Sequence, residues 1–267
     1  MTVTTPKAPE IQLRLGKLPA RPDAVQLKMT RYLIPATLPT PPAEFGHDAV
    51  IADWEMLGND TVGDCVIAGG LHETMLWTAN GSVEATMSTA AAIKNYSAIT
   101  GYRPSAGPVG DNPTDRGTDM QVAASYRRKK GLVDAAGKRH KVGAYLAIEP
   151  GDLEQHFLAI YLFGAIGIGL NFPDSAMTQF RAGQPWTVVN GAKIEGGHYV
   201  SGIARRGGNL IVVTWGREQV VDAGFLAKYN DESIAYVSAE YLRAGKSPEG
   251  FDADQLNADL AAITSGQ

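Results

Sequence analysis

The order of the residue periodicities along the chain constrains its fold most, because helical patterns come first and strand patterns follow. Apolar residues recur with helical spacing over 65–80, 87–100 and 119–130, and a glycine follows each segment. After Gly131, strand-like segments cover 141–148, 165–172, 185–189, 196–216 and 233–242, with helical patterns within 149–164 and 223–230. This segregation predicts an α+β protein of two lobes, with a site in the cleft between them.

The first 50 residues differ from the rest of the chain. They are rich in proline, as in "LPARPD" and "IPATLPTPPAEFG", which favours extended structure. Residues 1–50 are therefore predicted to form an arm that wraps the domain, reaches a neighbouring subunit in a homo-oligomer or larger assembly, or stays a mobile tail. Residues 51–131 are predicted to form the helical lobe, 132–245 the β lobe, and 246–267 a C-terminal tail that is a candidate helix.

The composition excludes several classes of protein. The chain is 44% hydrophobic and 19% charged with a formal net charge of −4, which argues against nucleic acid and anionic membranes as partners. The basic cluster "YRRKKG" is interpreted as a solvated helix end. No apolar run is of signal-peptide or membrane-spanning type. The single cysteine precludes an intrachain disulfide, so we expect a cytoplasmic protein.

That cysteine, Cys65, stands in "LGNDTVGDC", where the first helical pattern begins. A helix N-terminus stabilises a thiolate through its partial positive charge and its free N–H groups. A nucleophilic thiol also needs a base and donors for an oxyanion. Asn59 is a candidate donor, and His198 in "GGHYVSGIA" is a candidate base at the start of a strand. A lone cysteine in a helix is otherwise a small core residue.

Three features together resemble the papain-like cysteine peptidases. They are an amide six residues before a cysteine that begins a helix, a later histidine that follows two glycines, and a strand that ends in "WG". "RGTDMQVAASYRRKKGLVD" and "LIVVTWGREQVVDAGFLAKY" are similar to further parts of that family, so the resemblance covers about 50–242. It implies a papain-like fold, with a helical left lobe and a right lobe built as an antiparallel β-sheet or barrel. It also implies hydrolysis of peptide or isopeptide bonds through a Cys-His dyad and an acyl-enzyme.

The resemblance assigns a role to individual residues. Cys65 is the nucleophile, His198 the base, and Asn59 takes the place of the glutamine that donates to the oxyanion. Gly117 lies where the family pairs its backbone with an extended substrate, and Trp215 shields the histidine. The full set of expected site residues is Asn59, Cys65, His198 and Thr214 for catalysis, and Gly63, Gly117, Thr118, Gly197 and Trp215 for substrate binding.

The chain departs from the family pattern at several positions. Val62 replaces a disulfide cysteine, and Asp64 places a carboxylate beside the thiol, which disfavours the thiolate unless the side chain points away. Val213 aligns with the asparagine that orients the histidine, so Thr214 is expected to take that role if the strand is shifted by one residue. The short stretch before Cys65 also leads us to expect no long inhibitory prosegment.

Other functions stay open at this point. The alternative to a hydrolase is a catalytically impaired papain-fold protein that serves as a structural or binding component of a bacterial or phage assembly. A phage-encoded protein of this kind would be associated with the virion. Acyl transfer shares the acyl-enzyme step. No cofactor or metal is expected, because His72 beside Glu73 lacks further ligands and "GAIGIGL" runs from helix to strand, the reverse of a dinucleotide site.

Overall fold

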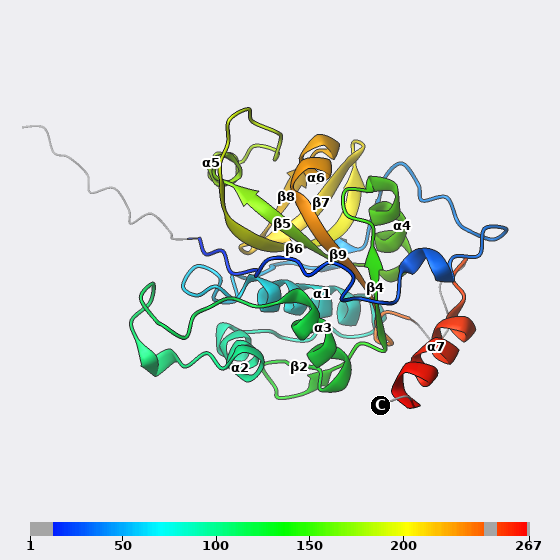
Figure 1. Cartoon of the computed structure of the whole chain (residues 1–267), viewed down its shortest axis with the longest axis horizontal. Helices are drawn as coiled ribbons and strands as arrows, with labels where there is room; N and C mark the ends of the chain where they lie inside the picture. The colour runs from blue at the N-terminus through cyan, green and yellow to red at the C-terminus, as the bar shows by residue number, and fades with distance from the viewer. Residues whose placement is uncertain (1–12, 243–249, 266–267) are drawn as a thin grey trace, which may run out of the picture.

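The computed structural model describes residues 13–242 and 250–265, which fold around one antiparallel sheet. Three helices, α1 to α3, lie below this sheet in Figure 1, and α4 and α6 lie on its opposite face. The prediction of an α+β fold with helices before strands is confirmed. Two buried clusters cover the two faces, one beneath α4 and α6 and one between α1, α3 and the sheet.

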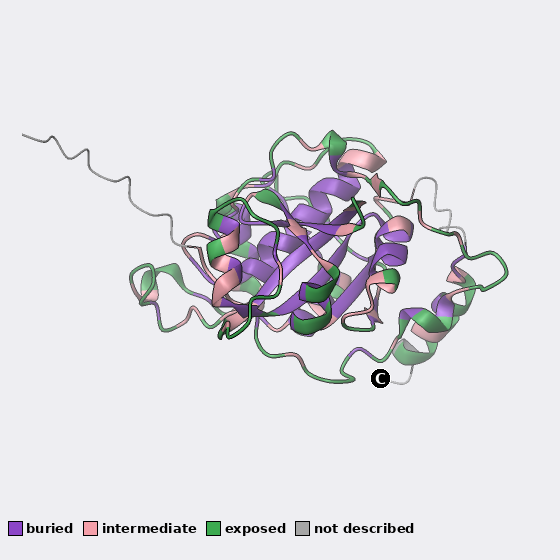
Figure 2. Ribbon diagram, turned by 90° about the horizontal axis from the view of Figure 1, so that it is seen from above, coloured by how far each residue is buried: buried purple, intermediate pink, exposed green. Residues whose placement is uncertain are grey.

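The helices α1 (Cys65–Gly81), α2 (Thr89–Thr100) and α3 (Met120–Lys129) match the first three helical patterns. Ser88 caps α2 and Asp119 caps α3, each through a side-chain oxygen that accepts a backbone N–H. Every residue of α1 from Cys65 to Thr78 is buried. This helix is therefore surrounded on all sides, as the purple elements at the centre of Figure 2 show.

The sheet has the strand order β4-β9-β5-β6-β7-β8, and β1 pairs with β6 off this path. All of its pairs are antiparallel. A separate two-stranded ribbon is formed by β2 and β3. The strand bounds are β1 Phe45–Gly46, β2 Leu132–Val133, β3 Arg139–His140, β4 Ala144–Ile148, β5 Ile166–Pro173, β6 Ile194–Arg206, β7 Asn209–Thr214, β8 Arg217–Val221 and β9 Asn230–Val237.

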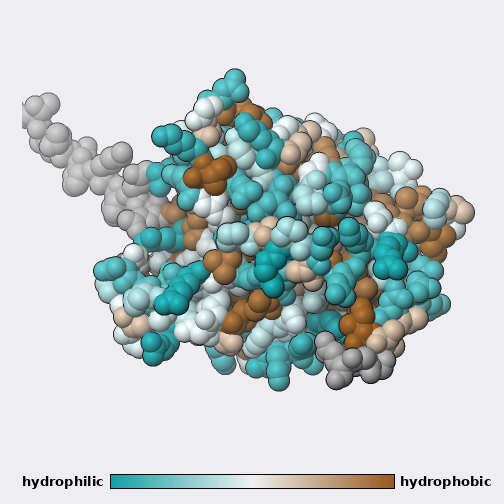
Figure 3. Space-filling view, viewed as in Figure 1, coloured by the Kyte–Doolittle hydropathy of each residue, from teal (hydrophilic) through white to brown (hydrophobic). Residues whose placement is uncertain are grey.

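The remaining helices surround this sheet. They are α4 (Leu153–Phe163), α5 (Asp174–Arg181), α6 (Ala223–Tyr229), α7 (Ala253–Ser265) and the short 3₁₀ turns Met29–Tyr32, Asp48–Val50 and Pro104–Ala106. The face seen in Figure 3 is mostly hydrophilic, with apolar side chains in scattered groups. None of the helices in the described ranges combines the length and the apolarity that a membrane crossing requires.

Three predictions about the elements were wrong. Residues 185–189 form no strand, because Trp186 turns its indole into the core and makes only an isolated bridge to Val221. The helix α5 was missed, since its eight residues present few apolar positions. The alternating sequence "AIGIGLNF" predicts a half-buried strand, yet all residues of β5 except Asn171 are buried, because helices cover both faces of the sheet.

His140 in the β2–β3 ribbon joins two carboxylates. Its Nδ1 lies 2.8 Å from Oε1 of Glu240, and its Nε2 lies 3.2 Å from Oδ2 of Asp134. Burial disfavours the imidazolium, but the hydrogen bonds to Glu240 and Asp134 outweigh it and raise the pKa of His140. The imidazole of His140 thus ties the ribbon to the chain that follows β9.

Candidate active site

Residues 14–18, which we call the cleft segment, cross between the sheet and the helices α1 and α3. In Figure 1 they belong to the blue trace that runs below β9 and above α1. The Gly16 and Lys17 N–H groups both donate to the carbonyl of Gly197, at 3.2 and 3.0 Å. The Thr118 N–H donates to Gly16, and the Leu18 N–H donates to Thr118, at 2.7 and 3.0 Å. The segment is therefore held as an added strand.

The described part of the N-terminal region thus packs on its own chain. This is one of the three arrangements that the sequence left open for residues 1–50, and residues 1–12 lie outside the described residues. No long inhibitory prosegment was expected, yet the short cleft segment occupies the site. A groove of about 500 Å³ stays open beside the cleft segment, lined by residues 110–113 and 115–117 and by Gly196 and Gly197.

The carbonyl of Arg14 is held by two side-chain donors. Nδ2 of Asn59 donates to it at 3.2 Å, and Nε1 of Trp215 donates at 3.2 Å. Asn59 is buried and is fixed by a second bond to the carbonyl of Val62, at 3.3 Å. The Asn59 amide therefore points toward a peptide carbonyl in the cleft, as an oxyanion donor must.

Cys65 is the first residue of α1, where the sequence predicted the helix to begin. Its side chain is buried, and this burial raises the pKa of the thiol to about 12. The backbone N–H groups of Tyr199 and Gly16 act in the opposite direction, since a donor stabilises the thiolate. The cleft segment thus passes beside the thiol at Gly16.

Asp64 disfavours the Cys65 thiolate, because its charge is one of the causes that raise the pKa of Cys65. The side chain is completely buried, and burial together with the nearby charge of Asp115 raises the pKa of Asp64 well above the usual range. Burial therefore favours the protonated form of Asp64, which reduces the charge that acts on the thiol.

His198 lies on β6 with its two ring nitrogens in different surroundings. Its Nε2 is 2.7 Å from Oγ1 of Thr214. Its Nδ1 is buried and has no hydrogen-bond partner among the described residues. If the Thr214 hydroxyl accepts the proton of Nε2, Nδ1 is the nitrogen that can accept a proton. Burial lowers the pKa of His198 to about 3. The imidazole is therefore neutral while the cleft is filled.

Trp215 covers the imidazole of His198. The two rings stack with their centroids 4.1 Å apart and an interplanar angle of 15°. Trp215 has a φ of 45°, in the left-handed region that favours glycine, and Gly216 follows with a φ of 74°. These two residues form the tight turn between β7 and β8. The strained backbone thus holds the indole over the histidine and toward Arg14.

A buried carboxylate joins the helix of Cys65 to the strand of His198. Glu73 of α1 accepts hydrogen bonds at 2.6 Å from the Tyr199 hydroxyl of β6 and at 2.6 Å from Nη1 of Arg127 of α3. Ser201 of β6 donates to the same carboxylate at 3.2 Å. Since these groups are almost fully buried, they fix α1 against β6 strongly.

The structure places Asn59, Gly63, Gly117, Thr118, Gly197 and Trp215 around the cleft segment. Cys65 makes no hydrogen bond with His198, since Nε2 of that imidazole bonds Thr214 and its Nδ1 has no partner among the described residues. Gly63 and Gly117 enclose Gly16 so closely that a Cβ on Gly16 would lie 1.9 Å from the Gly63 oxygen. Sequence reasoning missed the segment itself, although Gly16 is the only glycine among the first 45 residues. Within residues 13–242 and 250–265, no group of three or more His, Cys, Asp or Glu side chains is arranged to hold a metal.

The sequence matches no model of a known protein family and no curated protein sequence. Solved structures do match the fold. Xylellain, a cysteine protease from Xylella fastidiosa, superposes with a TM-score of 0.64 at 10% identity, covering 88% of this chain and 100% of its own. The procathepsin B S9 of Trypanosoma congolense gives 0.57 at 11% identity, covering 84% and 86%.

A third match is the Carica candamarcensis cysteine protease CMS1MS2 in complex with E-64, with a TM-score of 0.53, 9% identity and coverage of 74% and 99%. These neighbours are papain-like cysteine proteases, so the chain has the papain-like fold, and that prediction is confirmed. At such identities the comparison establishes the fold alone. The chemistry has to be argued from the site.

Proposed function

We propose that this protein is a thiol-dependent hydrolase of peptide or isopeptide bonds. The observation that carries the proposal is the cleft segment, an extended peptide held by Asn59, Thr118, Gly197 and Trp215. These are residues that the sequence assigned to substrate binding or to the oxyanion. A cleft that holds this segment is shaped to hold an extended substrate.

In the proposed reaction, Nδ1 of His198 takes the proton of Cys65, and the sulfur attacks the substrate carbonyl carbon. Thr214 accepts the Nε2 proton of His198, which keeps Nδ1 as the basic nitrogen. The Asn59 amide and the Cys65 N–H stabilise the oxyanion. His198 then returns the proton to the leaving amine, and water releases the acyl group from the sulfur.

The cleft segment has to leave before a substrate binds. Its backbone passes beside the buried thiol of Cys65. We therefore propose that the wild-type chain is self-blocked, with a buried thiol and a neutral His198. Opening of the segment would restore solvent to both groups and return each pKa toward its ordinary value.

A Gly16→Ala variant tests this function, since its methyl group excludes the cleft segment. The variant is mixed with a pool of defined peptides, and the products are identified by mass spectrometry. We expect cleavage that is absent from the Gly16→Ala/Cys65→Ala double variant. A folded Gly16→Ala variant that cleaves none of the peptides, in the pool or in an isopeptide-linked set, would instead favour the non-catalytic assembly role. Products joined to added amines would indicate acyl transfer.

A further inference from the structure

The Lys17 side chain of the cleft segment fills a narrow slot that ends in two carboxylates. Its Nζ lies 2.9 Å from Oδ2 of Asp231 and 3.3 Å from Oε1 of Glu232, and it donates to the Leu18 carbonyl at 2.9 Å. The Lys17 side chain has no solvent exposure, although lysine is almost never fully buried. Asp231 and Glu232 are neighbouring residues of β9 and are themselves largely buried.

The walls of this slot fit an unbranched side chain. A Cβ on Gly169 of β5 would lie 2.2 Å from Cε of Lys17, 2.8 Å from Sδ of Met120 and 2.9 Å from Cγ of Glu232. The missing side chain at Gly169 therefore makes the space through which the methylene stem passes. The slot is thus a long channel with an anionic end.

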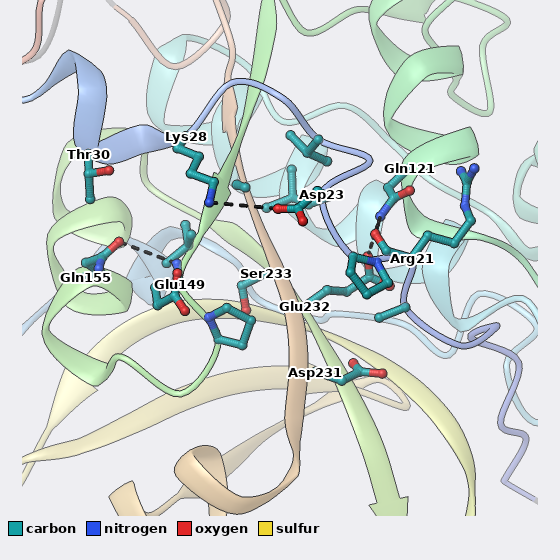
Figure 4. A pocket seen from close by; sticks show the side chains of 17 residues that line it. Arg21, Asp23, Lys28, Thr30, Gln121, Glu149, Gln155, Asp231, Glu232 and Ser233 are labelled. Carbon is teal, nitrogen blue, oxygen red and sulfur yellow. Dashed lines mark hydrogen bonds and ion pairs between the residues drawn. The ribbon is translucent and has the colours of Figure 1, made fainter.

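The charges around the slot favour a cation at its end. Glu232 also accepts from Nε2 of Gln121 at 3.2 Å, and burial is the main cause that raises its pKa. The acidic pair borders a further cavity of about 300 Å³, drawn in Figure 4. Two cations line this cavity. Arg21 pairs with Asp119 and also interacts with the charge of Glu232, and Lys28 pairs with Asp23, which lines the same cavity.

Removal of Lys17 would leave two partly buried carboxylates side by side without their ammonium partner. Such a pair is costly, because like charges repel and neither group is fully solvated. A substrate with a basic side chain at this position supplies the missing cation and removes this unfavourable free energy. A neutral or acidic side chain supplies no cation and leaves the free energy unfavourable.

We propose that the slot formed by Gly169, Asp231 and Glu232 selects substrates with a lysine or arginine side chain, which takes the position of Lys17. The proposal rests on the proposed function, since it names the substrate class of the same cleft. The cleft segment then blocks the site by presenting the side chain that the slot binds best. The cavity beyond the acidic pair gives the larger guanidinium group room.

The test uses an opened variant, which is the full chain with Gly16→Ala and Lys17→Ala. A labelled peptide of the sequence LRLGKLPA, that of residues 13–20, is added and its binding is measured by fluorescence anisotropy. The matched control is the same peptide with norleucine in place of lysine, which keeps the stem and removes the charge. We expect the lysine peptide to bind at least about tenfold more tightly.

The preference should fall below about threefold when Asp231→Asn and Glu232→Gln are added to the opened variant. Should that variant fail to fold by circular dichroism, Gly169→Ala in the opened variant serves instead, because its methyl group narrows the channel. Equal binding of the two peptides, or binding of neither, would overturn the proposal. Peptide binding does not require catalysis. Charge-dependent binding without cleavage of any peptide would therefore refute the proposed function but support the proposal about the slot.

Discussion

Gly16→Ala is expected to displace the cleft segment from the domain, because its methyl group would clash with Gly63. A Cβ at this position would lie 1.9 Å from the oxygen, 2.3 Å from the carbon and 2.6 Å from Cα of Gly63. All three are backbone atoms, so no side-chain rotation relieves the contact. The segment must move by more than about 1 Å, which breaks the hydrogen bonds that Gly16 makes with Thr118 and Gly197.

The expected gain in thiol reactivity follows from the pKa of Cys65. Burial raises it to about 12, whereas an exposed cysteine titrates near ~8.5. At about pH 7.5 the thiolate fraction would therefore rise by roughly three powers of ten. A thiolate of lower pKa is a weaker nucleophile, and this reduces the gain in reactivity by between about one and two powers of ten. We expect alkylation to become about a hundredfold faster.

The assay is labelling with iodoacetamide followed by intact mass, which is unambiguous because the chain has one cysteine. Gly143→Ala is the matched control, since a Cβ there would meet only the Val237 oxygen, at an ordinary 3.6 Å. Wild type and Gly143→Ala should label slowly and alike. A folded Gly16→Ala variant that labels at the wild-type rate would refute the reasoning, as would a wild type that labels as fast as free cysteine.

Three further predictions follow from buried contacts. In the Gly16→Ala background, Thr214→Val should lower kcat by roughly tenfold with little change in KM. Thr214→Asn should restore much of the lost kcat, because the amide oxygen can also accept the Nε2 proton of His198. Both effects are measured by steady-state kinetics on one cleaved peptide. Glu73→Ala should lower the free energy of unfolding by about 3–5 kcal/mol in urea titrations, because the substitution leaves the Arg127 guanidinium buried and unpaired. A loss below about 1 kcal/mol would contradict this prediction. The fold raises the pKa of His140, so its stabilisation is present below about pH 6.5 and is lost as the pH rises through the folded pKa. His140→Gln should therefore cost more stability at about pH 6 than at about pH 9, and an equal cost at both would contradict the account.

The sequence was sufficient to predict the parts of the site that depend on local pattern. Cys65 begins a helix because a turn-rich stretch precedes a helical apolar run, and His198 lies on a strand after two glycines. Thr214 was predicted only as a substitute for the missing amide, because strand register is a property of the sheet and not of one segment. Its hydroxyl does bond His198.

The contacts that the sequence did not predict are all long-range. Nothing local in "LRLGKLP" indicates that Gly16 lies between Gly63 and Gly117, or that Lys17 reaches carboxylates more than two hundred residues later. The buried charge of Lys17 is paired only by the tertiary fold, and the raised pKa of Asp64 is likewise a consequence of burial. Such features become visible only when the fold has placed the partners.

The central claim is that Cys65 and His198 act together on a carbonyl, and formation of the acyl-enzyme tests it most directly. The Gly16→Ala variant is mixed with an activated ester of a lysine-containing peptide, quenched in acid and weighed intact. The account predicts one acyl group per chain, mapped to Cys65, released within the assay and formed at least about a hundredfold more slowly with His198→Ala added. An adduct that forms at the same rate without the imidazole, or none at all, would contradict it.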